Sequence, residues 1–167
     1  MTIRPAPLAL LVTLFFCLPG LALAAADWTR FVHASSGAAA DVPPGFSVDA
    51  SNEVPGTGRL FRSADGRALL RIGGQPITEG RFAAFIASTI ARDEDEGWSV
   101  TFRSETPDWA AWTASRGGMI LHARVILVCG ERQVATLRVT YPALDVGRYE
   151  PIAEHAGRSL AQDGGCY

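Results

Sequence analysis

The stretch GGMILHARVILVCGERQVATLRVTYP, residues 117–142, decides the fold of this chain. Apolar and polar residues alternate on both sides of Gly130, which is typical of two β-strands joined by a turn. Proline cannot donate a hydrogen bond to a sheet, so Pro142 marks the end of the second strand. We therefore predict a long hairpin at the centre of an antiparallel sheet.

The register of this hairpin is predicted by matching two apolar faces. These faces carry Leu121, Ala123, Val125 and Leu127 on the first strand, and Ala135, Leu137, Val139 and Tyr141 on the second. A slip of one residue would put apolar side chains opposite polar ones. The match requires a three-residue loop at 130–132, an accepted hairpin length, and it places Cys129 opposite Gln133.

The same register supplies the main candidate for a binding site. It places Arg124 directly opposite Arg138, on the face that also carries His122. Like charges opposed on a sheet are unfavourable. One interpretation is that the two side chains diverge into water or that charges on an adjacent strand balance them. The other is that the arginine pair, with His122 beside it, receives an anion or an acidic partner surface through its guanidinium donors.

Two further strands are predicted immediately before the hairpin. Residues 98–105 alternate Trp98, Val100 and Phe102 with polar residues, 106–108 interrupt the pattern, and 109–115 resume it. Connections this short cannot cross over, so the four consecutive strands form an antiparallel meander. Trp109 and Trp112 point to opposite faces, one toward the core and the other toward a partner or a covering helix.

Residues 78–92 are predicted to form an amphipathic helix that begins at Thr78 as N-cap. Its apolar stripe consists of Phe82, Phe85, Ile86 and Ile90. The four acids at 93–96 would oppose the helix dipole at a C-terminus. We therefore expect the helix to end near Arg92 and the acids to form a solvated turn. A calcium loop is the alternative, but the distal glutamate and the glycine spacing are missing.

The remaining elements flank this sheet. We predict a strand at 28–33, a turn at 41–46, a loop at 47–58, a hairpin of 59–63 and 67–72 around an Asp-Gly turn, and a closing turn at 73–76. A last helix is predicted over 151–160, with Pro151 in its first turn and Glu154 able to pair with Arg158. Its inward residues are Ile152, Ala156 and Leu160. The fold class is therefore α+β, with helices packed on an antiparallel sheet.

Residues 1–26 are predicted to be a cleaved export signal. Arg4 supplies the basic start, 8–23 are apolar, and 22–26 offer the small-x-small pattern of a cleavage site. The alternative, a lipoprotein signal at Cys17, is disfavoured because Phe16 stands where that chemistry needs a small residue. The mature chain, residues 27–167, has the size of a single domain and is expected in the periplasm.

The charge of this mature segment restricts its partners. It holds 14 arginines, no lysine and 17 acidic residues, a net charge of −3. Nucleic acid and anionic membranes require a concentrated basic face, so we expect neither as a partner. No second apolar segment is long enough to span a membrane.

Two cysteines, Cys129 and Cys166, remain once the signal is removed. In an exported chain without C-x-x-C spacing they are expected to form a disulfide, the alternatives being free or intermolecular thiols.

The sequence offers little evidence for catalysis. His33, His122 and His155 form no metal-binding pair, and we expect no metal or cofactor. The G-x-S-x-G elbow of many serine hydrolases is missing, which leaves Ser35 or Ser115 as members of a triad assembled only in space.

Five motifs resemble a group of small exported proteins of alphaproteobacteria. They are WTRF (28–31), DVPPGF (41–46), LFRSADGRALLRIGG (60–74), VTYP (139–142) and EPIAEHAGRSL (150–160). The order of elements resembles the PsbP-like α/β/α sandwich. The sequence departs from the pattern at 35–40, where an aromatic residue is expected before DVPPGF. The resemblance implies a fold and a compartment and brings no catalytic residues.

Three functions follow from these observations. The first is a non-catalytic periplasmic protein of the cell envelope that binds an envelope protein or a small anionic ligand. The second is a periplasmic hydrolase, which would need a histidine within hydrogen-bond reach of a nucleophile and an acid. The third is a structural or stress-related envelope protein.

Overall fold

The computed structural model describes residues 27–52, 58–78, 80–164 and 166. The predicted signal, 1–26, and residues 53–57 of the predicted loop lie outside the described residues. The strands are β1 (Thr29–Val32), β2 (Ala38–Val42), β3 (Phe46–Val48), β4 (Arg59–Ser63), β5 (Leu69–Pro76), β6 (Ser99–Glu105), β7 (Trp109–Arg116), β8 (Met119–Val128), β9 (Gln133–Pro142) and β10 (Ala161–Gln162). The α-helices are α1 (Phe82–Asp95) and α2 (Val146–Arg158), and η1 (Ala50–Asn52) and η2 (Ala143–Asp145) are 3₁₀ turns.

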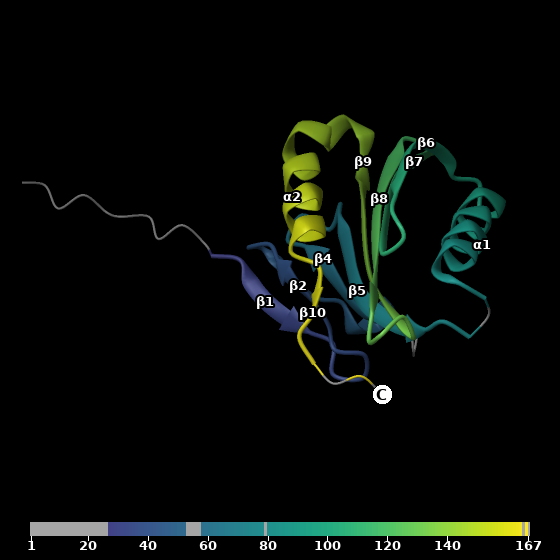
Figure 1. The fold of residues 1–167 in the computed structure, drawn as a ribbon. Helices are drawn as coiled ribbons and strands as arrows, with labels where there is room; N and C mark the ends of the chain where they lie inside the picture. The colour runs from purple at the N-terminus through teal and green to yellow at the C-terminus, as the bar shows by residue number, and fades with distance from the viewer. Residues whose placement is uncertain (1–26, 53–57, 79, 165, 167) are drawn as a thin grey trace, which may run out of the picture.

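In the described part of the chain the strands form two antiparallel sheets (Figure 1). The large sheet has seven strands in the order β3-β4-β5-β9-β8-β7-β6, so the predicted meander β6–β9 is confirmed. The small sheet has the order β1-β2-β10. This arrangement confirms the predicted α+β class with an antiparallel sheet.

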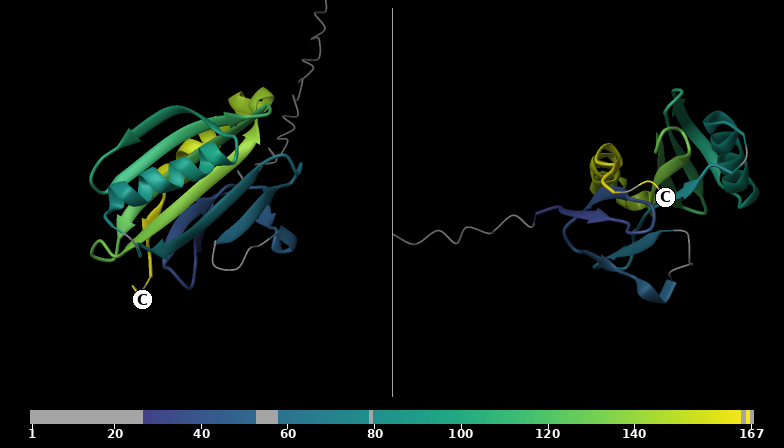
Figure 2. Two further views of the ribbon diagram at one scale, coloured as in Figure 1. Left: turned by 90° about the vertical axis from the view of Figure 1, so that its right-hand side faces the viewer. Right: turned by 60° about the horizontal axis from the view of Figure 1, so that its bottom comes forward.

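The large sheet is the middle of three layers. Helix α1 lies across one face, and α2 with the small sheet lies on the other (Figures 1 and 2). The alternation of β8 and β9 divides the buried residues into two cores. Leu121, Val125 and Trp112 pack with α1, whereas Leu137, Val139 and Tyr141 pack with α2 and β2. The central strands are therefore apolar on both sides.

This two-sided burial explains why the predicted hairpin register is wrong by one residue. The loop has four residues, 129–132, and Val128 rather than Cys129 pairs with Gln133. Arg124 consequently pairs with Leu137, and Arg138 pairs with Ala123. The face-matching argument assumed that each strand has one apolar side. With a covering layer on each face, the slipped register also buries apolar side chains.

The predicted end of the first helix is also wrong. Helix α1 has Arg81 rather than Thr78 as its N-cap and continues through Asp95. Asp93 is only 3% exposed and is not part of a solvated turn. Its carboxylate accepts hydrogen bonds from Trp112 Nε1 at 2.8 Å and from Arg138 Nη1 and Nη2 at 3.1 and 2.6 Å. The unfavourable interaction between an acid and the C-terminal end of the helix dipole is weak, and the ion pair of buried Asp93 with Arg138 outweighs it.

The N-terminal half contains the predicted hairpin of β4 and β5 and differs from the other predictions in three places. β5 runs to Pro76 instead of turning at 73–76, and it pairs with β9 throughout. Gly74 permits this pairing, because a Cβ there would lie 2.6 Å from the carbonyl oxygen of Val134. The predicted loop contains strand β3 and the turn η1. The predicted first strand is present as β1, and the turn predicted at 41–46 is shorter, because it lies between the end of β2 at Val42 and the start of β3 at Phe46. The three alanines 38–40 are fully buried in β2.

A bulge between Val100 and Phe102 breaks the alternation predicted for β6. Trp98 and Val100 pack beside α1, but Phe102 is turned to the other face of the sheet and is 57% exposed. Bulges at a sheet edge turn side chains in this way and hinder edge-to-edge pairing.

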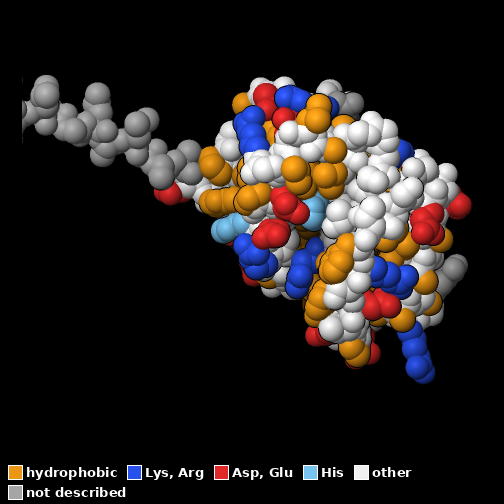
Figure 3. Space-filling model, turned by 90° about the horizontal axis from the view of Figure 1, so that it is seen from above, with side chains coloured by type: hydrophobic (Ala, Val, Ile, Leu, Met, Phe, Trp, Pro, Cys, Tyr) orange, Lys and Arg blue, Asp and Glu red, His pale blue; other side chains and the backbone are white. Residues whose placement is uncertain are grey.

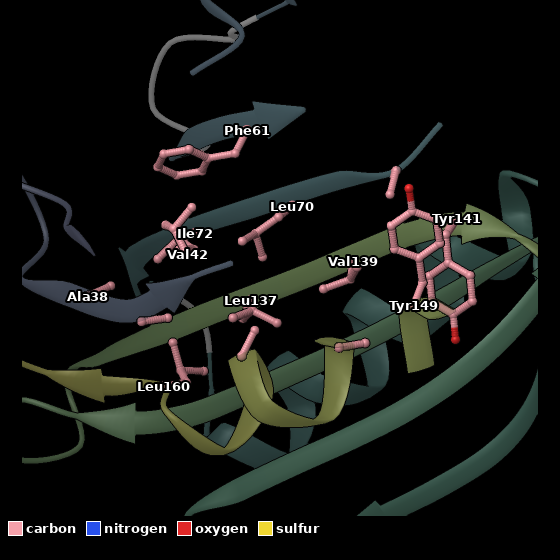
Figure 4. Close-up of a cluster of buried hydrophobic side chains, with 14 of the residues drawn as sticks. Ala38, Val42, Phe61, Leu70, Ile72, Leu137, Val139, Tyr141, Tyr149 and Leu160 are labelled. Atoms are coloured by element: carbon pink, nitrogen blue, oxygen red, sulfur yellow. The ribbon is translucent and has the colours of Figure 1, made fainter. Parts of the chain in front are cut away.

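Helix α2 begins five residues earlier than predicted, at Val146, so Pro151 lies inside it. The additional turn buries Tyr149, whose hydroxyl donates to Asp65 at 2.8–2.9 Å in the predicted Asp-Gly turn. Tyr141 and Tyr149 lie side by side with their hydroxyl groups pointing in opposite directions (Figure 4). The predicted Glu154–Arg158 pair is present at 3.3 Å.

The predicted disulfide joins Cys129 to Cys166, with the two Cα atoms 5.4 Å apart. Strand β10 pairs with β2 and directs the C-terminal residues back toward the tip of the β8–β9 hairpin. No helix in the part of the chain that the structure describes is long and apolar enough to cross a membrane.

Replacing Cys129 and Cys166 by serine is expected to lower the free energy of unfolding by about 4 kcal/mol, because the disulfide closes a loop in the unfolded chain. Urea unfolding of the oxidised protein and of the double variant measures this difference. A reductant should remove the difference by destabilising only the parent protein. Equal unfolding midpoints under oxidising conditions would contradict the prediction.

Asp93→Asn is expected to lower the free energy of unfolding by about 3 kcal/mol, because it leaves the Arg138 guanidinium partly buried without its counter-charge. Glu94→Gln is the matched control, since Glu94 is the exposed neighbour in the same helix. Its effect should stay within about 0.5 kcal/mol. Urea unfolding measures both variants. Equal free energies of unfolding for the two would show that the Asp93 ion pair does not hold α1 on the sheet.

Candidate functional site

A groove runs along the side of α2 where the large sheet is left uncovered. α2 and β2 cover β5 and β9, but no layer of the described structure covers the same face of β6 and β7. One part of the groove, about 310 Å³, is lined by Ala111, His122, Arg124, Glu154, Gly157 and Arg158, among others. A second part, about 430 Å³, continues toward β6 and is lined by Phe102, Thr113, His122, Glu150 and Glu154, among others. We call the two parts together the α2 groove.

Small residues keep this groove open. Ala111 and Thr113 of β7 form its floor between the longer side chains of the neighbouring strands. Gly157 of α2 faces Arg124, and a Cβ at this glycine would lie 3.7 Å from Arg124 Cδ. The groove therefore exists where Gly157 of α2 and the small residues of β7 leave space between longer side chains.

Arg124 is the unpaired cation of the groove. Its guanidinium carbon lies 4.9 Å from the centroid of the Trp109 ring, a cation–π contact. Its Nε is buried without a hydrogen-bond partner. No ion pair joins Arg124 to any carboxylate of the described residues, whereas Arg158 is paired with Glu154. The contact with Trp109 holds the guanidinium in place, and its charge has no carboxylate partner among the described residues.

His122 lines the groove and lies next to Tyr141, which is fully buried. Their rings are stacked with centroids 5.8 Å apart. Burial lowers the pKa of His122 below its ordinary 6.5, and the negative charges of Glu150 and Glu154 only partly offset this. Burial raises the pKa of Tyr141 to about 12, and its hydroxyl has no hydrogen-bond partner among the described residues. At neutral pH both rings are uncharged.

Acidic, arginine and histidine side chains alternate with hydrophobic ones on the surface seen from above (Figure 3).

The structure brings together only part of the predicted site. Arg124 and His122 line the α2 groove, but Arg138 lies on the opposite face of the sheet against Asp93. The predicted Arg124–Arg138 pair therefore does not form. The arginine that does lie opposite Arg138 is Arg71, on β5. The error follows from the one-residue shift in register, because successive residues of a strand point to opposite faces.

Sequence reasoning did not identify the wall of the groove. This wall is the polar stripe of α2, Glu150, Glu154 and Arg158, which recurs every four residues. The spacing could have indicated one helix face beside the sheet. It could not have shown that this face lies over His122 and Arg124, because that depends on how α2 crosses β9.

The residues considered for hydrolysis do not assemble into a triad among the described residues. Ser35 Oγ lies 3.4 Å from His33 Nδ1, and Ser115 lies in β7 opposite Ser99. His33 Nδ1 lies 2.8 Å from Ser36 Oγ, within a tight turn in which that buried hydroxyl also accepts from the Ala38 N–H. His155 stacks on Trp28 at 3.9 Å and contacts Asp41 at 3.3 Å. In the α2 groove, His122 has no hydrogen bond to a described serine or acid. Among the described residues no three His, Cys, Asp or Glu side chains are close enough together to hold a metal ion.

Comparison with known proteins shows the fold but not a family. No family model matches the sequence, and no curated protein matches it. The chain is similar to the solution structure of cyanobacterial PsbP (CyanoP) from Synechocystis, at a TM-score of 0.61 and 13% identity over 87% of this chain and 96% of that one. It is also similar to the Saccharomyces cerevisiae Ran-binding protein Mog1p, at a TM-score of 0.61 and 7% identity over 83% and 96% of the chains. The expected PsbP-like fold is therefore confirmed.

Acidification is expected to destabilise the protein through His122. Its folded-state pKa lies below 6.5, so the unfolded chain takes up the proton first, and stability is lost as the pH falls from 6.5 toward the folded-state pKa. The slope from this group is at most about 1.4 kcal/mol per pH unit. Urea unfolding between about pH 7.5 and 5 should show a smaller loss for His122→Gln than for the parent.

His155→Gln is the control for this measurement, because His155 is a partly exposed histidine away from the groove. The His155→Gln variant should still show the loss of stability on acidification that His122 causes. An NMR titration in which the His122 ring protonates at or above pH 6.5 would refute the prediction.

Proposed function

We propose that this chain is an exported, non-catalytic binding or accessory protein of the cell envelope, and that the α2 groove is its binding site. The observation that carries the proposal is Arg124, a cation held against Trp109 at the edge of an open groove without an ion-pair partner among the described residues. An arginine without a counter-charge beside an open groove is suited to receive an anionic group through its guanidinium donors.

The fold is compatible with a binding role. One protein of similar fold is named a Ran-binding protein, so the architecture can serve protein recognition. At 7% identity this says nothing about which partner the present chain binds. The groove itself lacks the geometry of a hydrolase, because His122 makes no hydrogen bond to a nucleophile or an acid among the described residues.

Export is the second part of the proposal. It is supported by the basic, apolar and small-residue pattern of residues 1–26 and by the Cys129–Cys166 disulfide, since disulfides persist in oxidising compartments. The proposed site of action is the periplasm.

The full-length chain, expressed in a Gram-negative host, is expected in the periplasmic fraction as a mature protein that begins at Asp27.

Tagged mature protein is expected to capture a specific envelope component. Arg124→Gln should reduce this capture at least about tenfold by removing the guanidinium donors. Arg81→Gln, the same change of charge at the N-cap of α1, should leave capture unchanged. Retention in the cytoplasm would overturn the export proposal, and equal capture by both variants would overturn the assignment of the groove.

A further inference from the structure

We infer that the α2 groove binds the carboxylate group of a ligand that also carries an apolar group, with Arg124 as the carboxylate receptor. The inference rests on the proposed function and adds the chemical class of the ligand. A peptide C-terminus and a small organic acid share this chemistry.

The position of Arg124 favours a planar oxyanion. Its stem passes beside Gly157, and its guanidinium carbon lies 4.9 Å from the centroid of the Trp109 ring, so two contacts hold the side chain in place. A guanidinium donates two parallel N–H bonds to a carboxylate that lies in its own plane. Because the side chain is already ordered, little conformational freedom remains to be lost when a ligand binds.

The charges around Arg124 favour one negative charge over two. Glu154 is paired with Arg158 at 3.3 Å, so these two charges largely offset each other. Glu150 lines the part of the groove toward β6 and makes no ion pair with a described residue. The single unpaired cation, Arg124, neutralises a carboxylate monoanion, whereas a phosphate dianion keeps an excess negative charge beside Glu150. The charges of the groove therefore favour a carboxylate over a phosphate.

The apolar part of the ligand has a place beside this receptor. Ala111 and Leu137 line the same part of the groove as Arg124, and Phe102 presents a 57% exposed ring in the part toward β6. A hollow of about 310 Å³ is at the small end of the range for ligand pockets, so it suits a ligand with a single ring.

The experiment measures binding of small probes to the mature protein by NMR and calorimetry. N-acetylphenylalanine should bind and shift the signals of His122 and Ala111, because both residues line the groove. Its amide, which has the same apolar group and no charge, should bind at least about tenfold more weakly. Phenyl phosphate should bind more weakly than the carboxylate. The tripeptide Ala-Ala-Phe with a free C-terminus indicates a peptide ligand if it binds more tightly than N-acetylphenylalanine, and a small organic acid if it does not.

Two pairs of variants test the roles of the residues. Arg124→Gln should weaken carboxylate binding by about tenfold or more, and Arg124→Lys should have an intermediate effect because it keeps the charge but loses the planar pair of donors. Gly157→Ala adds a methyl group inside the groove at ordinary contact distance from Arg124, so it should fold and bind severalfold more weakly. Gly147→Ala is its control, since a Cβ there meets nothing within 4 Å.

Three results would overturn the inference: no carboxylate binding at millimolar concentration, equal binding of acid and amide, or binding that Arg124→Gln does not change. The proposed function is judged separately by capture of the envelope component. If capture depends on Arg124 while the probes do not bind, the carboxylate inference fails and the proposed function stands.

Discussion

The structure depends on the burial of β8 and β9 on both faces. Alternate residues of these strands, such as Leu121 and Leu137, belong to two separate cores, so neither face can be left to water along its whole length. A helix must cover each side, and the chain supplies α1 before the meander and α2 after it. The small sheet β1-β2-β10 completes the cover over β5 and β9, where α2 alone is too narrow. The three layers thus follow from the composition of two central strands.

A hydrogen-bonded carboxylate anchors each covering helix to the sheet. Asp93 at the end of α1 accepts from Trp112 of β7 and from Arg138 of β9, so it ties the helix to two strands. At the start of α2 the direction is reversed, because Tyr149 donates to Asp65 in the β4–β5 turn. Apolar packing sets how much surface is buried but is not directional. These directional contacts fix where each helix lies along the sheet.

The elements of this fold were predictable from the sequence, but the register between strands and the contacts between elements were not. Periodicity identified the meander and the helix stripe with Ile86, and the count of cysteines left after the export signal identified the disulfide between Cys129 and Cys166. It could not fix the register of β8 and β9, because a strand with two apolar faces satisfies either register equally well. For the same reason it placed Arg124 and Arg138 together when they lie on opposite faces. Residues that become important through a partner on another element, such as Asp93, give no signal in their own segment.

The α2 groove is a consequence of the same layered arrangement. The seven-stranded sheet is wider than the cover formed by α2 and the small sheet, so the strands toward β6 keep one open face. An open face of large apolar residues would promote aggregation, and here small residues such as Ala111 and Thr113 occupy it instead. The bulge in β6 turns Phe102 onto this face, and the alternation of β8 places Arg124 and His122 on it. Each of these features opposes maximal stability and is compatible with a surface kept for a ligand. The same two-sided burial that requires α2 therefore also leaves the groove beside it.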